Sequence, residues 1–558
     1  MRLRFLFFVF LLAWLALVIR LFYWQVKSFD KLFLAARLQQ QSKSTLVAPR
    51  GKILSADNYP LVFSTLKFSL ILNPSIISDP QKVLAEIASS SAQKIDQEKF
   101  FKVVEDKNLS WYSLLKGLSL TEKEEIEKKN LPGIEFESSW SRAYPEASMA
   151  AQTLGFVGIG DNDKERGYYG LEGFYDRELS GVAGEKTWER DLLGRLILLG
   201  ERKETSSRPG RDLSLYLDRS IQFLVEKALS KGIAQYRAVS GSVVVMDPFT
   251  GGVLALASWP AYDPANFANE DKNNFANPTI YAGFEPGSIF KPLVMATAID
   301  LGLLRPDSIC PICTGSVQIG EYTIKTWNEK YFPNSTMTEV IQHSDNVGMV
   351  YVAKKIGIEN LYSYLVKLGF GEKTGIDLEE EASPTLRSEK DWGEIDLATA
   401  GFGQGIAVTA VQMTRAIAAI ANGGKLVIPR VVAKIKDGDK EILLKQTEPK
   451  QVFKPITTKV IKEMMVNAVE NGEAKWAKPK NYKIAGKTGT AQIPLAGHYD
   501  EKKTIASFVG FAPADRPLFV MLVTLREPKS SPWGSETAAP LWFEIAKGIF
   551  QVKGIPPS

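Results

Sequence analysis

The sequence predicts a membrane-anchored protein of the mixed α/β (α+β) class, whose main domain combines an antiparallel sheet with a helical subdomain. Three observations predict this. One long apolar run lies at the N-terminus, two β-prone segments within 240–258 are joined by the turn "DPFTGG", and three more strand-like segments lie far downstream. With 558 residues, 45% of them hydrophobic, the chain can bury several cores.

The apolar run covers residues 3–24 and contains only two charges, Arg4 and Arg20. As a helix it would be roughly 33 Å long, enough to cross the hydrocarbon core of a bilayer. Arg2 and Arg4 stand at its start, so the N-terminus is expected in the cytoplasm and the rest of the chain outside. Because no small-residue cleavage site follows, we expect an uncleaved anchor rather than a signal peptide. A polar helix completes the first region, 1–45.

Residues 46–215 form the second predicted region. Short β-prone runs broken by Gly, Asn and Pro are followed by helices with alternating charges, which are typical of solvated faces. No cluster of chemically reactive residues occurs there, so the region is interpreted as an N-terminal scaffold or dimerisation-type domain.

A polar linker then gives way to a strand and an amphipathic helix, and the third region, 216–558, begins. The turn "DPFTGG" is typical of an antiparallel hairpin. The three downstream strands are predicted at 481–492, 504–513 and 517–525, followed by a closing helix at 539–550. Many helices lie between the two groups of strands, so we expect strands from both ends of the domain to meet in one sheet around a helical insertion.

Composition excludes several classes of function. The net charge of +5 is mild, and no basic block with interleaved aromatic residues is present, which argues against nucleic-acid binding. Only two histidines occur, His343 and His498, and there is no His-Glu-x-x-His pattern. Two histidines make a Ser-His-Asp triad or a histidine-rich zinc site a poor expectation. Acid-base chemistry is expected to depend on lysine, serine or carboxylates.

Cys310 and Cys313 are the only cysteines, in "CPIC". They could pair in an oxidising compartment, although a two-residue loop is tight, and a metal site would need further ligands, with His343 the nearest candidate in the sequence. The spacing assigns neither, and a local structural feature is favoured.

Three short motifs follow one another in the third region: "SIFK" from Ser288 to Lys291, "SDN" from Ser344 to Asn346, and "KTGT" from Lys487 to Thr490. Residues three apart share a helix face, so a serine in Ser-x-x-Lys can have a lysine base one turn away. The spacing alone proves little. It recurs in this chain at serines 28, 64, 91 and 113.

A second Lys-Thr-Gly, at 373–375, enters an acidic turn and is set aside. Lys487, in contrast, is placed at the end of a predicted strand that returns through 506–511, so its neighbours can line the edge of a cleft.

The three motifs, in this order, are those of penicillin-binding proteins and class A β-lactamases. The chain resembles a class B penicillin-binding protein, and more particularly the division-specific septal peptidoglycan transpeptidase. The resemblance extends from the anchor through blocks at 49–53, 142–158, 168–181, 284–292, 344–348, 401–413, 486–492 and 506–513. It implies the penicillin-binding/serine β-lactamase-like fold for the third region.

The resemblance also implies a serine-type D-Ala-D-Ala transpeptidase whose catalytic residues are Ser288, Lys291, Ser344, Asn346 and Lys487 and whose substrate-binding residues are Thr488, Gly489 and Thr490. Ser288 is the implied nucleophile, and Lys291 is its base if burial and neighbouring cations lower the lysine pKa. Ser344 is expected to pass a proton toward the departing amine, and Asn346 to hold Lys291 and the substrate amide.

On the strand side, the resemblance implies that Lys487 supplies positive charge while the hydroxyls of Thr488 and Thr490 bind the terminal carboxylate of the stem peptide. The backbone N–H groups of Ser288 and Thr490 are the expected oxyanion hole. No cofactor and no metal are implied.

The implied ligands and partners are peptidoglycan stem peptides on lipid-linked nascent glycan, β-lactams, and a polytopic glycan polymerase with other division proteins. The implied location is the bacterial inner membrane, with a single span and a periplasmic catalytic domain. Three alternatives remain: an elongation-type transpeptidase, a D,D-carboxypeptidase or β-lactamase that resolves the same acyl-enzyme with water, and a non-catalytic sensor or scaffold. We find no Glu-x-x-Leu-Asn segment to place a deacylating water, so a long-lived penicilloyl adduct is expected.

Overall fold

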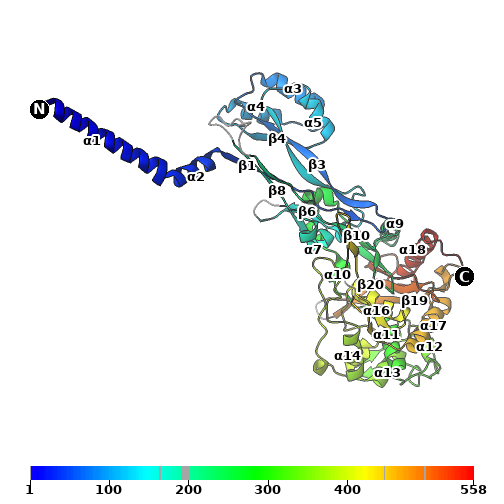
Figure 1. Ribbon diagram of the computed structural model, residues 1–558. Helices are drawn as coiled ribbons and strands as arrows, with labels where there is room; N and C mark the ends of the chain where they lie inside the picture. Colours follow the sequence, from blue (N-terminus) through cyan, green and yellow to red (C-terminus); the bar gives the residue numbers. More distant parts are fainter. Residues whose placement is uncertain (1, 162–164, 190–201, 445–446, 496–497, 558) are drawn as a thin grey trace. The chain divides into compact units, whose positions relative to one another are not determined.

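The computed structural model describes residues 2–161, 165–189, 202–444, 447–495 and 498–557 (Figure 1). The chain divides into two compact units. Unit 1 comprises residues 1–50, 66–140 and 180–210, and unit 2 comprises 51–65, 141–179 and 211–558. The predicted scaffold region, 46–215, therefore supplies residues to both units. Its residues 162–164 and 190–201 lie outside the described parts.

Unit 1 begins with the predicted apolar helix, α1 (Arg2–Phe22), which continues through the π-helical turn η1 (Tyr23–Lys27) to α2 (Phe29–Gln40). No residue of α1 is buried. Among the described residues, the segment Arg2–Lys27 is the one helix long and apolar enough to cross a membrane. It fits a single-pass anchor.

The rest of unit 1 combines two groups of strands with three helices. In the first group, β8 (Gly184–Glu189) pairs antiparallel with β1 (Gln41–Leu46) and β9 (Lys203–Thr205). In the second, β4 (Tyr112–Leu118) pairs with residues 68–72 of β3 (Pro60–Leu72). The remaining elements are α3 (Pro80–Ser90), α4 (Gln97–Glu105), α5 (Leu120–Glu127) and β5 (Ile134–Ala143). Side chains of Asp79, Asp96 and Ser119 cap the three helices and fix where each begins.

Unit 2 is built on a five-stranded antiparallel sheet with strand order β12-β11-β21-β20-β19. Its strands are β11 (Ser240–Met246), β12 (Val253–Trp259), β19 (Ala485–Leu495), β20 (His498–Ala512) and β21 (Phe519–Arg526). β11 pairs with β21 from Ser240↔Arg526 to Met246↔Val520. The prediction that strands from both ends of the domain meet in one sheet is confirmed.

Alternate residues of β11 enter different cores, as the two-residue period of a strand requires. Val243 and Val245 pack with α9 (Arg219–Tyr236) and α18 (Ala538–Val552). Val244 and Met246 belong to the larger core that also contains α16 (Ala410–Ala421). The sheet is thus covered by helices on both faces, and its edge strand β19 borders the helical subdomain (Figure 1).

The helical subdomain lies between β12 and β19 in the sequence, as predicted. Its longer elements are α11 (Lys291–Asp300), α12 (Met337–Gln342), α13 (Asn346–Ile356), α14 (Ile358–Lys367), α15 (Glu394–Ala400), α16 and α17 (Pro455–Asn471). Shorter elements are α10 (Pro278–Tyr281), β13 (Val317–Ile319), β14 (Tyr322–Ile324), β15 (Lys425–Leu426), β18 (Lys450–Gln451) and the 3-10 turns η3 (Pro264–Asn269), η4 (Lys272–Asn274), η5 (Gly287–Phe290), η6 (Glu389–Asp391) and η7 (Lys475–Ala477).

The other elements of unit 2 lie outside the five-stranded sheet. They are β2 (Ile53–Leu54), α6 (Ala151–Leu154), β6 (Phe156–Ile159), β7 (Glu165–Tyr168), α7 (Gly170–Phe174), α8 (Asp176–Leu179), β10 (Asp212–Leu215), β16 (Val432–Asp437) and β17 (Lys440–Leu443). A buried ion pair braces this part, with Arg142 Nη2 2.5 Å from a carboxylate oxygen of Glu172.

Candidate active site

The predicted nucleophile, Ser288, lies in the 3-10 turn η5, directly before α11. Gly287 enters this turn with φ +57°, a left-handed conformation that favours glycine. A Cβ at Gly287 would also come within 3.2 Å of Thr490 O and Ala491 Cβ, so the missing side chain lets β19 approach. Pro292 occupies the first turn of α11. The entry to α11 is therefore irregular, with a 3-10 turn before the helix and a proline in its first turn.

A second glycine, Gly403, contacts the backbone of the same turn. The Gly287 N–H donates to Gly403 O at 2.9 Å. Gly403 has φ +81°, and a Cβ there would lie 2.2 Å from Gly287 O. Any larger residue at position 403 would displace the backbone that carries Ser288. Gly403 thus has a structural role in shaping the site.

Lys291 lies at the start of α11 and is wholly buried. Its Nζ donates to Ser344 O at 2.6 Å, to Asn346 Oδ1 at 2.8 Å and to Ser344 Oγ at 3.3 Å. All three acceptors are neutral. Burial, and then the charge of Lys487, lower the pKa of Lys291 well below its ordinary value, while the carboxylates of Asp345 and Glu473 oppose the shift.

The Ser344–Asn346 segment links α12 to α13. Ser344 has φ +56°, an uncommon conformation for a residue with a side chain, and both its carbonyl and its hydroxyl oxygen face Lys291. Asp345 caps α13, because its Oδ1 accepts from the N–H groups of Val347 at 2.8 Å and Gly348 at 3.2 Å. Asn346 accepts from Lys291 and donates from Nδ2 to Lys325 O at 3.0 Å.

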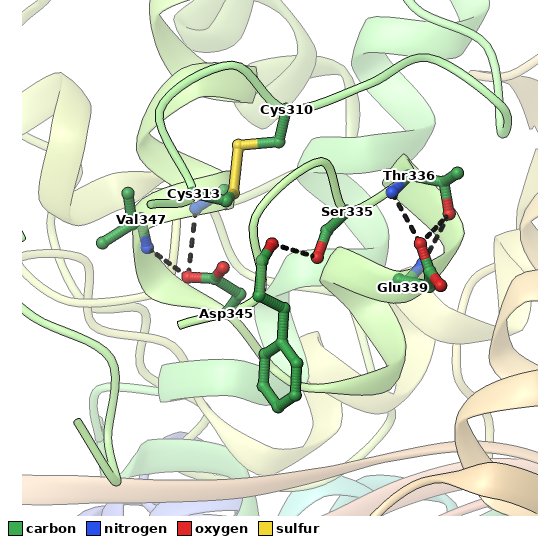
Figure 2. Close-up of a disulfide and its surroundings, with 9 residues drawn as sticks. Cys310, Cys313, Ser335, Thr336, Glu339, Asp345 and Val347 are labelled. Atoms are coloured by element: carbon green, nitrogen blue, oxygen red, sulfur yellow. Dashed lines mark hydrogen bonds between the residues drawn. A yellow bond between two sulfur atoms is a disulfide. The ribbon is translucent and has the colours of Figure 1, made fainter. Parts of the chain in front are cut away.

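Cys310 and Cys313 form a disulfide behind this segment, which settles the alternatives that their spacing left open. Figure 2 shows it beside Asp345 and Val347, with Ser335 and Thr336 nearby. The Cys310 N–H donates to Ser335 O, and a Cβ at Gly348 would meet Cys313 Sγ at 3.2 Å. The disulfide loop thus packs between the N-terminal ends of α12 and α13 and supports the turn that presents Ser344.

The third motif lies in β19, which pairs with β20 in the register Lys487↔Val509, Thr488↔Phe508 and Gly489↔Ser507. The strand begins at Ala485. The expectation that Lys487 stands at the end of its strand is therefore wrong, because the pairing with β20 continues well beyond this residue. Thr490 Oγ1 accepts from the Gly534 N–H at 2.9 Å, which ties the segment carrying Trp533 to β19.

Lys487 is 3% exposed and lies beside the cleft. Its Nζ donates to Thr488 O and Thr488 Oγ1, both at 3.2 Å. Burial lowers the pKa of Lys487 to about 8, while the negative charge of Glu473 opposes the shift. A large fraction of Lys487 is therefore protonated at neutral pH, beside a lysine whose ammonium form is strongly disfavoured.

The three motifs meet at one cleft. Its lining consists of Gly287, Ser288, Trp327, Ser344, Asn346, Phe402, Gln404, Glu473, Thr488, Gly489, Thr490 and Trp533. Lys291 and Lys487 are buried and bond to lining residues. All the predicted site residues are thus brought together, although they come from distant parts of the sequence.

Several of the lining residues, among them Trp327, Glu473 and Trp533, have no role in the site predicted from the sequence. Trp327 and Trp533 meet edge to face, with ring centroids 4.9 Å apart. Glu473 follows α17 and adds a carboxylate. Neither tryptophan stands in a periodic pattern, and Glu473 lies in a short turn, so no local signal in the sequence identified them.

Comparison with known proteins places this fold and site in one class. Residues 241–551 match the family model "Penicillin binding protein transpeptidase domain", and residues 45–215 match "Penicillin-binding Protein dimerisation domain". The chain belongs to the class B penicillin-binding protein family of D,D-transpeptidases.

Two curated relatives illustrate the range of the family. Stage V sporulation protein D of Bacillus subtilis is 30% identical over 515 residues, which cover 91% of this chain and 79% of the relative. Peptidoglycan D,D-transpeptidase FtsI of Escherichia coli is 32% identical over 435 residues, covering 77% and 71% of the two chains. The family resemblance inferred from the motifs is confirmed.

Solved structures support the fold. Penicillin-binding protein 2X of Streptococcus thermophilus gives a TM-score of 0.78 at 24% identity, covering 92% of this chain and 80% of that one. Penicillin-binding protein 3 of Mycobacterium tuberculosis, in complex with aztreonam, gives 0.71 at 26% identity and covers 92% and 98%. The predicted combination of an antiparallel sheet and a helical subdomain in the penicillin-binding fold is confirmed.

Proposed function

We propose that this protein crosslinks peptidoglycan stem peptides through an acyl-enzyme on Ser288, and that it does so in septal wall synthesis. The observation that carries the proposal is the environment of the Lys291 amine, which favours its neutral form. This lysine is wholly buried, its hydrogen-bond acceptors among the described residues are all neutral, and it follows Ser288 by three residues. A neutral amine in this position is a base for the serine hydroxyl.

The chemistry follows from this arrangement. Ser288 Oγ attacks the carbonyl carbon of the penultimate D-Ala, and its proton passes to the Lys291 amine. The peptide C–N bond then breaks, and the terminal D-Ala leaves as an amine with a proton delivered from Lys291 through the Ser344 hydroxyl. An amine of a second stem peptide attacks the ester, its proton returns to the oxygen of Ser288, and the new amide bond is the crosslink.

The other motif residues are assigned to binding. Lys487 and the hydroxyls of Thr488 and Thr490 supply positive charge and donors for the terminal carboxylate of the donor peptide. The N–H groups of Ser288 and Thr490 are assigned to the oxyanion of the tetrahedral intermediate, where each donor is typically worth about 3 kcal/mol of transition-state stabilisation. Gly489 leaves room for the packing of β19 against η5.

The test is covalent labelling of the full-length protein in detergent micelles with a fluorescent penicillin, followed by mass spectrometry of the labelled peptide. We expect one adduct, on Ser288, and no labelling of Ser288→Ala. Ser113→Ala is a matched control, because Ser113 also precedes a lysine by three residues but lies in β4. An adduct on another residue, or labelling of Ser288→Ala, contradicts the proposal.

The same labelling separates the alternatives. An adduct that persists supports a transpeptidase, whereas rapid release of hydrolysed penicillin supports a β-lactamase. Septal function is tested by location: we expect a fluorescent fusion at midcell, while a signal along the lateral wall would support the elongation-type alternative. A Ser288→Ala protein that still sustains crosslinking in depleted cells would support the scaffold alternative.

The membrane topology and partners belong to the same proposal. Arg2 and Arg4 favour a cytoplasmic N-terminus and a periplasmic active site. We propose residues 46–215 as a scaffold that, together with the anchor at 3–24, contacts a polytopic glycan polymerase of the division machinery. Lipid-linked nascent glycan then supplies the stem peptides.

A further inference from the structure

Two lysines share the active-site cleft, and the proposed chemistry needs them in different charge states. Lys291 is neutral when it accepts the serine proton, while Lys487 is charged when it binds a carboxylate. Both are buried, and each raises the cost of charging the other. An arrangement of two buried cations without an anion would favour the loss of both protons.

The cleft contains an anion at this point. Glu473 lines it together with Ser288, Ser344, Asn346 and Thr488. The Glu473 Oε1 atom is buried and has no hydrogen-bond partner among the described residues. Its negative charge acts on Lys291 and on Lys487, although within the described part of the chain it forms no ion pair with either lysine. The carboxylate of Glu473 therefore influences the pKa of both lysines without pairing directly with one of them.

The backbone around Glu473 fixes this position. The residue follows Gly472, which ends α17, and a Cβ at Gly472 would come within 2.2 Å of Ala468 O and 3.1 Å of Gln342 O. Asn467 Nδ2 also donates to Gln342 Oε1 at 2.8 Å. The end of α17 is therefore pressed against the end of α12, two residues before Ser344. A glycine at 472 permits this contact, and the next residue, Glu473, lines the cleft.

The other charged groups near the cleft differ from Glu473 in their partners or in their position. Besides Glu473, the titratable or charged groups within three residues of a lining residue are Glu285, Lys291, Lys325, Glu329, Lys330, His343, Asp345, Glu470, Lys475, Lys487 and Glu536. Glu285 accepts from the Gly405 N–H, Glu536 accepts from the Ser531 hydroxyl, and Glu470 pairs with Lys478. Asp345 Oδ1 caps α13, while its Oδ2 is buried without a hydrogen-bond partner among the described residues. The charge of Asp345 favours the protonated form of Lys291, whereas Glu473 acts on both lysines. Lys325 pairs with Glu329. The His343 ring stacks on Phe332. Of the residues that line the cleft, Glu473 is the one that carries a carboxylate.

We propose that Glu473 is the counter-charge of the Lys291–Lys487 pair, a positioning residue that holds the pair with a single positive charge located on Lys487. This inference rests on the proposed serine acyl-enzyme. Because acylation requires a neutral Lys291 and a charged Lys487, the charge of Glu473 would set the pH range in which Ser288 is acylated.

The direction of the effect follows from the signs of the charges. A neighbouring anion favours the protonated form of a lysine. Removing it lowers the pKa of both lysines. Lys291 then becomes neutral at lower pH, which extends acylation on the acid side, and Lys487 loses its charge at lower pH, which curtails acylation on the alkaline side. The whole bell-shaped profile moves to lower pH.

The test measures the second-order rate constant of acylation by fluorescent penicillin from pH 5.5 to 9.5, with full-length protein in micelles. For Glu473→Gln we expect a roughly fivefold loss at pH 9, and at the acid end a rate equal to or above that of the wild type. Glu473→Asp should restore most of the alkaline activity. The matched control is Glu470→Gln, a carboxylate on the same helix end that pairs with Lys478 at the surface.

If Glu473→Gln lowered the acylation rate equally at every pH, without moving the acid or the alkaline limb of the profile, the proposal that Glu473 is a counter-charge would be overturned. If Glu473→Gln does not fold, as judged by its thermal midpoint, Glu473→Ala provides the same test, because it removes the charge without adding volume. A wild-type protein that takes up no label on Ser288 would instead contradict the proposed function, so the two failures are distinguishable.

Discussion

The tripeptide Lys-Thr-Gly occurs twice in unit 2, and the two copies differ in almost everything except sequence. At 373–375 the Thr374 N–H and hydroxyl both donate to Glu381 Oε1, at 2.6 and 2.5 Å, and the Gly375 N–H donates to Glu381 Oε2 at 3.0 Å. Lys373 is exposed. This copy is a turn whose polar groups are satisfied by one carboxylate.

At 487–489 the same residues lie in an edge strand, and Lys487 is buried beside the cleft. An edge strand keeps one row of backbone groups outside the sheet and so can present donors to a ligand. The comparison teaches that the tripeptide itself specifies no function. Only in the second copy does the strand place the lysine in a buried, low-dielectric position beside the cleft that contains Ser288, the proposed nucleophile.

The largest contrast between the copies is expected from their lysines. Lys487→Ala removes the positive charge proposed to bind the substrate carboxylate, and we expect the acylation rate by penicillin to fall about 100-fold or more. Lys373→Ala removes a solvated charge and should leave the rate unchanged. Stopped-flow labelling of both variants measures this. Comparable losses in the two variants would show that the burial of Lys487 is not what distinguishes the copies.

Much of this contrast could be predicted from the sequence. Strand-like segments flank Lys487, whereas Lys373 enters an acidic turn. The hairpin at 240–258 and the three late strands predict the sheet in which Lys487 lies. These signals are local patterns of hydrophobicity and turn residues, which a single segment displays by itself. The N-terminal apolar helix, which fits a membrane anchor, is predicted by the same kind of local signal.

Other features depend on long-range packing and left no local signal. The contact between the end of α17 and Gln342 places Glu473 in the cleft, but a short turn after a helix has no periodicity to reveal its direction. The pairing of Cys310 with Cys313 depends on the backbone path of a tight loop, so spacing alone left it open. The place of Lys487 near the start of its strand is set by pairing with β20, not by its neighbours in the chain.

The two glycines sharpen the comparison further. A Cβ at Gly489 would lie 2.4 Å from Ser507 Oγ and 2.8 Å from Ile289 Cγ2, so Gly489→Ala should push β19 away from η5. We expect a roughly tenfold loss of acylation from this displacement. Gly375 has φ +80° but open space, with Ile428 Cγ2 at 3.7 Å, so Gly375→Ala should cost about 1 kcal/mol of stability through backbone strain alone. Acylation rates and thermal midpoints of both variants separate the two effects. Equal acylation rates would contradict the close packing at Gly489.

No effect on acylation, only one on stability, is expected at Glu381, the carboxylate that accepts the hydrogen bonds of the first copy. Glu381→Gln replaces one carboxylate oxygen by an NH2 group, so two hydrogen-bond donors, the new amide and the Gly375 N–H, would face each other. This should reduce the free energy of unfolding by about 1–2 kcal/mol and lower the thermal midpoint by roughly 2 °C. Acylation should be unchanged, because Glu381 does not line the cleft. Glu372→Gln is the matched control, since that carboxylate is exposed on the same loop. If Glu381→Gln slowed acylation without lowering the midpoint, the first copy would have a connection to the active site that the hydrogen bonds of its turn do not provide.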